Sequence, residues 1–86
     1  MPLQLRPDIA TTDTDDGLVL LDERTGRYWQ LNPTGAHVLH ALIEGHPPER
    51  IAADLATRYH IDVQQAAHDI TAVTDHLHAA KLVAAS

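Results

Sequence analysis

The chain has 86 residues, with twelve acidic and six basic side chains, a formal net charge of −6 at pH 7 and no cysteine. Nucleic-acid binding draws much of its affinity from cationic contacts to phosphates, so this charge argues against a nucleic acid and favours a protein or a basic peptide as partner. The missing cysteines exclude disulfides and thiolate metal sites, and no apolar run approaches the roughly 18–20 residues of a membrane span. We therefore expect a cytoplasmic protein with a single domain over residues 1–86.

Apolar runs of strand length, separated by turn signals, predict three strands in the first third of the chain. They are expected at residues 9–13, 18–21 and 27–31, joined by an acidic turn at 13–17 and a glycine-ending turn at 22–26. The third run is rich in aromatic residues, which favour strands. The short connections predict an antiparallel meander.

Capping signals and a 3.6-residue apolar period predict three helices in the rest of the chain. Asn32 is a good N-cap for the first helix, and Gly45 ends it. Residues 47–49, Pro-Pro-Glu, open the second helix. Asp62, followed three residues later by Gln65, resembles a capping box and opens the third.

Strands followed by helices predict an α+β fold, in which a three-stranded antiparallel sheet lies against a three-helix, winged-helix-like bundle. A winged-helix DNA-binding protein has the same outline, so the fold alone does not decide the function. A DNA-reading third helix would need basic residues. The predicted helix offers only Lys81 at its end, against Asp69 and Asp75.

No motif indicates an enzyme or a cofactor site. The four glycines are isolated, and the carboxylates are spread among turns and helix caps, where Asp and Glu usually have structural roles. His37, His40 and Glu44 share one face of the first helix, at spacings that suit a metal such as zinc. The alternative is that they form the solvated face of that helix. We predict no catalytic residue, metal or cofactor.

The third strand, residues 27–31, is the most informative segment. Trp29 and Leu31 share one face and Tyr28 and Gln30 the other, so both faces carry an aromatic residue and both are candidates for being covered. If this strand is the edge of the sheet, its unpaired N–H and C=O groups are a template for another strand. That strand is either a bound peptide or a second copy, so we expect a monomer or an edge-paired homodimer. Ordinary core aromatics on a protected strand are the alternative.

The third helix, expected to end near Lys81 with residues 82–83 packed as a tail, offers a second wall. Its apolar stripe centres near Ile70 and Leu77. In helical projection Asp69, Val73 and His76 lie on one flank, and Thr74, His78 and Lys81 on the other. Either flank is a candidate to line a groove beside the edge strand.

Residues 25–35, Thr-Gly-Arg-Tyr-Trp-Gln-Leu-Asn-Pro-Thr-Gly, resemble a signature of the PqqD-like family of RiPP recognition elements. The resemblance continues, in order, at residues 42–45, 51–55, 69–70 and 82–83. In this family the leader of a ribosomally made precursor peptide adds as a strand beside the third strand and against the third helix. The resemblance thus implies a peptide-binding site at Arg27, Tyr28, Trp29, Gln30, Leu31, Asp69, Ile70, Val73 and His76.

Within the family, an acidic, free-standing chain of this size looks most like the recognition proteins of lasso-peptide biosynthesis. The resemblance then implies capture of the leader for a leader peptidase and afterwards a cyclase. It also implies a pocket from Trp29, Leu31, Ile70 and Val73 for a Tyr-x-x-Pro pattern in the leader. The alternative is a PqqD-type chaperone for a radical enzyme of quinone-cofactor synthesis. Leu39, where many relatives carry tryptophan, departs from the pattern and bears on the subfamily.

Overall fold

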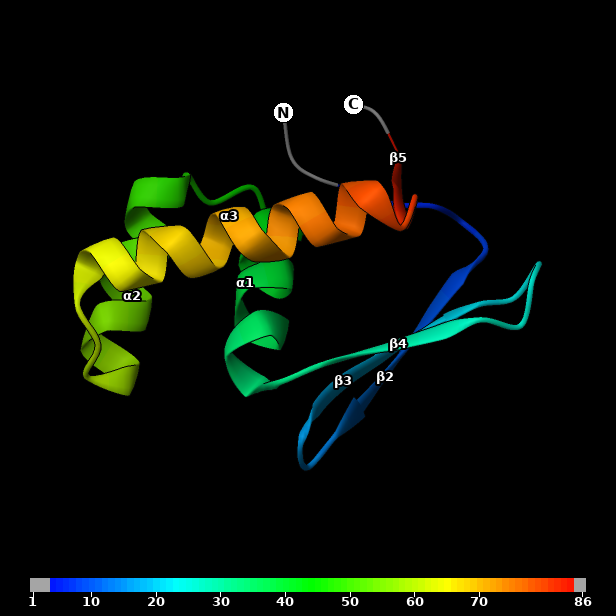
Figure 1. The fold of residues 1–86 in the computed structure, drawn as a ribbon, viewed down its shortest axis with the longest axis horizontal. Helices are drawn as coiled ribbons and strands as arrows, with labels where there is room; N and C mark the ends of the chain where they lie inside the picture. The colour runs from blue at the N-terminus through cyan, green and yellow to red at the C-terminus, as the bar shows by residue number, and fades with distance from the viewer. Residues whose placement is uncertain (1–3, 85–86) are drawn as a thin grey trace.

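A three-stranded sheet precedes three helices in the computed structural model, which describes residues 4–84 and confirms the predicted α+β class. Figure 1 shows α3 lying across α1 and α2, with the sheet extending to one side. No helix within residues 4–84 is long and apolar enough to cross a membrane. The elements are β1 (Gln4–Leu5), β2 (Ile9–Thr14), β3 (Gly17–Asp22), β4 (Tyr28–Leu31), α1 (Pro33–Ile43), α2 (Pro48–Tyr59), α3 (Val63–Ala79) and β5 (Val83–Ala84).

The predicted meander forms the three-stranded sheet β2-β3-β4, antiparallel throughout. Its alternating side chains separate into a buried and an open face. Leu18 pairs with Leu31 on the buried face, whereas Leu21 pairs with Tyr28 on the open face. Tyr28 is 72% exposed, so within residues 4–84 only one of the two candidate faces of the third strand is covered.

The helix starts follow the capping signals, with one exception. Asn32 Oδ1 accepts a hydrogen bond from Gly35 N at 2.7 Å, and Asp62 Oδ1 accepts one from Gln64 N at 2.7 Å. Both side chains satisfy N–H groups that the first turn of a helix leaves without partners. Gln65 does not complete a capping box, because its amide instead donates to Asp69 Oδ1 at 3.0 Å.

Two hydrophobic clusters join the layers, and half-buried Val73 on α3 packs against both. Each fully buried leucine contributes about 1.5–3 kcal/mol of transfer free energy. The cluster under the sheet contains Ile9, Leu18, Leu20, Leu31, Ala36, Leu39, Leu77, Leu82 and Val83. The cluster among the helices contains Val38, Ala41, Ile51, Ala52, Leu55, Ala66 and Ile70.

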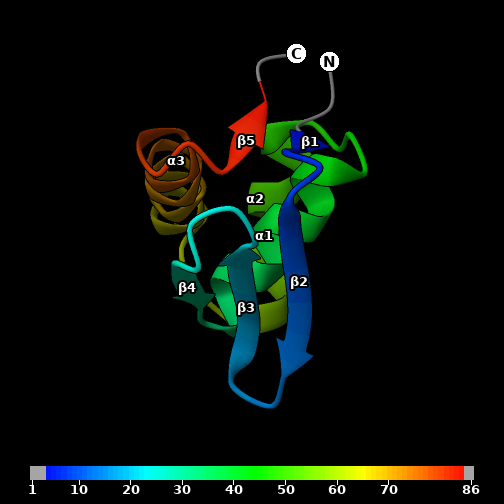
Figure 2. The same cartoon turned by 90° about the vertical axis from the view of Figure 1, so that its right-hand side faces the viewer.

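The two ends of the described chain pair with each other, which the sequence analysis did not predict. β1 and β5 form a separate antiparallel pair, with Gln4 opposite Ala84 and Leu5 opposite Val83. Figure 1 shows β5 at the C-terminal end of α3, and Figure 2 shows β1 near β5. Leu82 is fully buried just before β5, so the expected packed tail is confirmed and extends into a strand.

Gly17 opens β3 at a point where a side chain has no room. Its φ of +135° is rare for other residues, and a Cβ there would overlap the carbonyl oxygen of Leu31 at the end of β4. We expect Gly17→Ala to lower the free energy of unfolding by about 2–3 kcal/mol, because backbone strain and a steric clash with backbone atoms add.

Gly26→Ala is the matched control, measured with Gly17→Ala by urea unfolding. Gly26 has a φ of +77° but open space around it, so the alanine there meets only backbone strain. Its expected cost is about 1 kcal/mol. Equal costs for the two variants would contradict the close approach of Gly17 to Leu31.

Candidate functional site

β4 is an edge strand, because the sheet order places a neighbour on only one of its sides. Asp22 N donates to Arg27 O at 2.8 Å, which makes these two residues a hydrogen-bonded pair. Hydrogen-bonded and non-bonded pairs alternate along an antiparallel ladder. By this alternation, the N–H and C=O groups of Trp29 and Leu31 point toward β3. Those of Tyr28 and Gln30 point toward the free edge.

A groove runs between this edge and α3. Figure 2 shows β4 as the strand of the sheet nearest to α3. Three adjoining hollows follow the groove, and the second shares His76 with the first and Val73 with the third. The strand side is lined by Arg27, Trp29, Gln30, Leu31 and Asn32, with Thr34 and Gly35 beyond them. The helix side is lined by Asp69, Ala72, Val73, His76, Ala79, Ala80 and Lys81.

The structure brings together seven of the nine residues predicted for the site. Those that line the groove are Arg27, Trp29, Gln30, Leu31, Asp69, Val73 and His76. Tyr28 points to the open face of the sheet instead, although its backbone belongs to the free edge. Ile70 is 5% exposed in the cluster among the helices, and it lines a hollow beside Ala52 of α2 on another face of α3.

The flank of α3 that carries Asp69, Val73 and His76 is therefore the one facing the strand. Lys81 was expected on the opposite flank, and that expectation is wrong. α3 ends at Ala79, and Lys81 has a left-handed φ of +58°, so a helical projection does not apply to it. Small residues such as Ala72 and Ala79 also line the groove. Sequence reasoning missed them because alanine carries no chemical signal.

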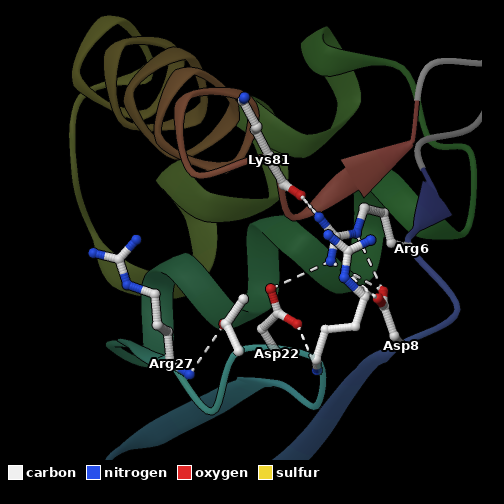
Figure 3. Close-up of polar contacts among 7 residues, drawn as sticks. Arg6, Asp8, Asp22, Arg27 and Lys81 are labelled. Atoms are coloured by element: carbon white, nitrogen blue, oxygen red, sulfur yellow. Dashed lines mark hydrogen bonds and ion pairs between the residues drawn. The ribbon is translucent and has the colours of Figure 1, made fainter.

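A network of charged residues holds the far end of the groove together (Figure 3). Arg6 Nη2 lies 3.1 Å from Asp8 Oδ1 and 3.3 Å from Asp22 Oδ2, while Arg6 Nη1 donates to the carbonyl oxygen of Lys81 at 2.9 Å. The same guanidinium thus contacts the β3–β4 hairpin and the chain leaving α3. This fixes the position of the hairpin relative to the end of α3.

Asp22 is 6% exposed and charged. Burial by itself would raise its pKa, but the hydrogen bond from the backbone N–H of Arg24 and the nearby Arg6 guanidinium outweigh burial. The net result is a pKa below the ordinary value of 3.8. Asp22 is therefore an ionised carboxylate in the folded protein at neutral pH.

The histidines of α1 do not converge on a common point. His37 is half-buried with its ring edge-on to Tyr59, at a centroid distance of 6.3 Å, and burial followed by the charge of Arg58 lowers its pKa. His40 instead lies 3.6 Å from Asp13, and Glu44 pairs with His46 at 3.0 Å. The solvated-face interpretation is thus wrong for His37. Within residues 4–84, no group of three His, Cys, Asp or Glu side chains is arranged to hold a metal.

Comparisons with known proteins give consistent results. The family described as coenzyme PQQ synthesis protein D (PqqD) matches residues 17–83. A solved structure described as lasso peptide synthetase B1 complexed with the leader peptide is 38% identical, with a TM-score of 0.89, over 99% of this chain and 100% of that one. A second, described as TbiB1 in complex with the TbiA(beta) leader peptide, is 25% identical, with a TM-score of 0.80, over 96% of each chain. A search of curated proteins found no match.

The charge of Asp22 gives a testable dependence of stability on pH. Because its folded pKa is depressed, Asp22 stabilises the fold above its ordinary pKa, and this contribution is lost as the pH falls through the folded pKa. Asp22→Asn keeps an acceptor for the N–H of Arg24 but removes the charge. We expect a lower melting temperature than wild type at neutral pH and a shrinking difference in acid.

Asp15→Asn, in the exposed β2–β3 turn, is the matched control for the same melting series by circular dichroism. It removes an equal charge from a solvated position and is expected to leave the melting temperature nearly unchanged. A deficit for Asp22→Asn that stays constant across the acid range would contradict the assigned role of the carboxylate.

Proposed function

The chain belongs to the PqqD family, as a PqqD-like RiPP recognition element, and on that premise we propose that it binds the leader of a ribosomally made precursor peptide. The leader would add to the sheet as a further strand, alongside β4 and against α3. The observation that carries this proposal is the free edge of β4, which faces a groove rather than solvent on all sides.

Strand addition uses two kinds of contact. Main-chain hydrogen bonds to the outward N–H and C=O groups of Tyr28 and Gln30 supply affinity for any extended peptide. Side-chain pockets then select the sequence. Half-buried Trp29 and Val73, with Leu31 between them, offer an apolar lining suited to the tyrosine and proline of a Tyr-x-x-Pro pattern.

Tyr28 and Ile70, the two predicted site residues that do not line the groove, have other roles in this proposal. Tyr28 contributes its backbone, since its side chain lies on the open face of the sheet. Ile70 supports the groove wall from within the core and does not touch the leader. Because the leader and a second copy of the chain would pair with the same edge, leader binding excludes a homodimer formed through β4.

The bound leader would then be delivered to a leader peptidase and afterwards to a cyclase of lasso-peptide biosynthesis. The two similar structures, both described as leader-peptide complexes and one as a lasso peptide synthetase component, support the lasso pathway over quinone-cofactor synthesis. In this role the chain carries no catalytic residue. It raises the effective concentration of the precursor at the enzymes that process it.

The proposal is tested by titrating the ¹⁵N-labelled protein with synthetic leaders encoded by precursor genes beside its own gene. We expect micromolar or tighter binding of one leader, lost when its Tyr-x-x-Pro positions become alanine. A strand added to β4 would also slow hydrogen exchange at the amides of Tyr28 and Gln30. The amides of Trp29 and Leu31 already pair with β3 and would change little.

Failure of every neighbouring leader to bind would overturn the proposed function. Binding without added protection at Tyr28 and Gln30 would retain a leader-binding role but reject strand addition. A preference for a quinone-cofactor precursor over lasso leaders would favour the PqqD-type chaperone.

Asp69 gives a prediction for a leader with a basic residue at the Asn32 end of the groove. It lies where α3 faces Asn32 and Thr34, and it is half-buried with its position held by Gln65. We expect Asp69→Lys to weaken such a leader by about 1–2 kcal/mol, because it replaces attraction by repulsion at a partly desolvated site. Isothermal titration measures the change.

Asp75→Lys is the matched control, since it makes the same charge change on an exposed position of the same helix that does not line the groove. Equal losses in the two variants would assign the effect to net charge alone. No loss in Asp69→Lys at low salt would remove Asp69 from the site.

A further inference from the structure

The end of the groove beside Arg27 differs in charge from the rest. It widens into a hollow of about 470 Å³. In a chain with six Lys and Arg residues and a net charge of −6, two of those cations meet at this one hollow. The lining residues are Arg27, Trp29, His76, Ala79, Ala80 and Lys81.

The backbone of both cationic residues is fixed by a hydrogen bond to the carbonyl oxygen. The carbonyl oxygen of Arg27 accepts from Asp22 N at 2.8 Å, and that of Lys81 accepts from Arg6 Nη1 at 2.9 Å. The side chains themselves are exposed and, within residues 4–84, form no ion pair. Figure 3 shows the Arg27 side chain extending away from the network that pairs Arg6 with Asp8 and Asp22.

The two kinds of arginine in this region therefore have different roles. Arg6 forms ion pairs with Asp8 and Asp22 of the chain itself, so its charge stabilises the fold. The side chains of Arg27 and Lys81 have no partner among the described residues, and they line the groove that we assign to the leader. A guanidinium presents a planar fork that matches a carboxylate, and an ammonium adds a second charge. Half-buried Trp29 adds an apolar surface to the lining of the same hollow.

We propose that this hollow is a carboxylate subsite, which binds an Asp or Glu side chain of the leader between Arg27 and Lys81. The inference rests on the proposed leader binding and adds to it a charge requirement on the leader. His76 lines the same hollow and presents a further donor to the bound carboxylate.

The groove then has opposite charges at its two ends, which sets a spacing in the peptide. From Arg27 to Asn32 an extended strand covers roughly 17 Å, and from Asp69 to Ala80 a helix rises roughly 16 Å. The two walls thus match in length. At about 3.4 Å per residue these lengths correspond to about five positions of an extended leader. Because side chains alternate, an acidic and a basic leader residue presented to the same side would be about four or six positions apart.

Charge reversal tests the subsite. Arg27→Glu with Lys81→Glu should weaken a C-terminally amidated synthetic leader by about tenfold or more at low salt. Amidation leaves only side-chain carboxylates in the peptide. Replacing the responsible leader Asp or Glu by Lys should weaken binding to the wild type and restore binding to the double variant.

The matched control is Arg50→Glu with Arg58→Glu, the same charge change on exposed positions of α2 that do not line the groove. Equal affinity of the two double variants, or no rescue by any Lys-substituted leader, would overturn the subsite. Failure of the wild type to bind any leader would instead overturn the proposed function. Arg27→Gln and Lys81→Gln, checked by circular dichroism, repeat the test if the reversed pair does not fold.

Discussion

The Arg6 guanidinium links parts of the chain that are far apart in sequence. It contacts Asp8 before the sheet, Asp22 at the end of β3 and the carbonyl oxygen of Lys81 after α3. A partly buried charge costs desolvation free energy, which is offset when several donors and acceptors are satisfied together. The strand and the helix that form the walls of the groove are thereby held at a fixed separation at one end. At the other end α1 connects directly to β4 and holds it beside α3.

β4 illustrates how four residues serve two purposes. Its side chains and its backbone groups point in different directions. Some of its residues can therefore hold the strand in the sheet while others leave backbone groups available at the edge. The side chain of Leu31 belongs to the cluster under the sheet, and partly buried Trp29 packs against that cluster. The backbone N–H and C=O groups of the same two residues point toward β3. The backbone groups of Tyr28 and Gln30 are left for the outer edge. An exposed edge of this kind is a template for unwanted strand pairing, and here α3 lies alongside it across the groove.

Much of this arrangement was predictable from local signals. Asn32 and Asp62 cap their helices as expected, and period-two alternation correctly separated Trp29 and Leu31 from Tyr28 and Gln30. Features that depend on distant contacts were not predictable. Lys81 leaves the helical path because Leu82 is drawn into the core. The pairing of β1 with β5 needs both ends of the described chain in place, and two-residue strands carry no pattern of their own.

The β1–β5 pair also determines how the domain can be joined to others. Paired strands lie about 5 Å apart, so a short linker would close the described chain into a ring with little strain. Such a ring could be reopened at the α1–α2 loop, far in sequence from β4 and from the end of α3. An enzyme fused at Met1 or Ser86 would start five residues from Arg6 or Lys81. Fusion at either terminus would therefore place that enzyme near the Arg27 end of the groove, close to the part of a bound peptide that leaves the groove at that end.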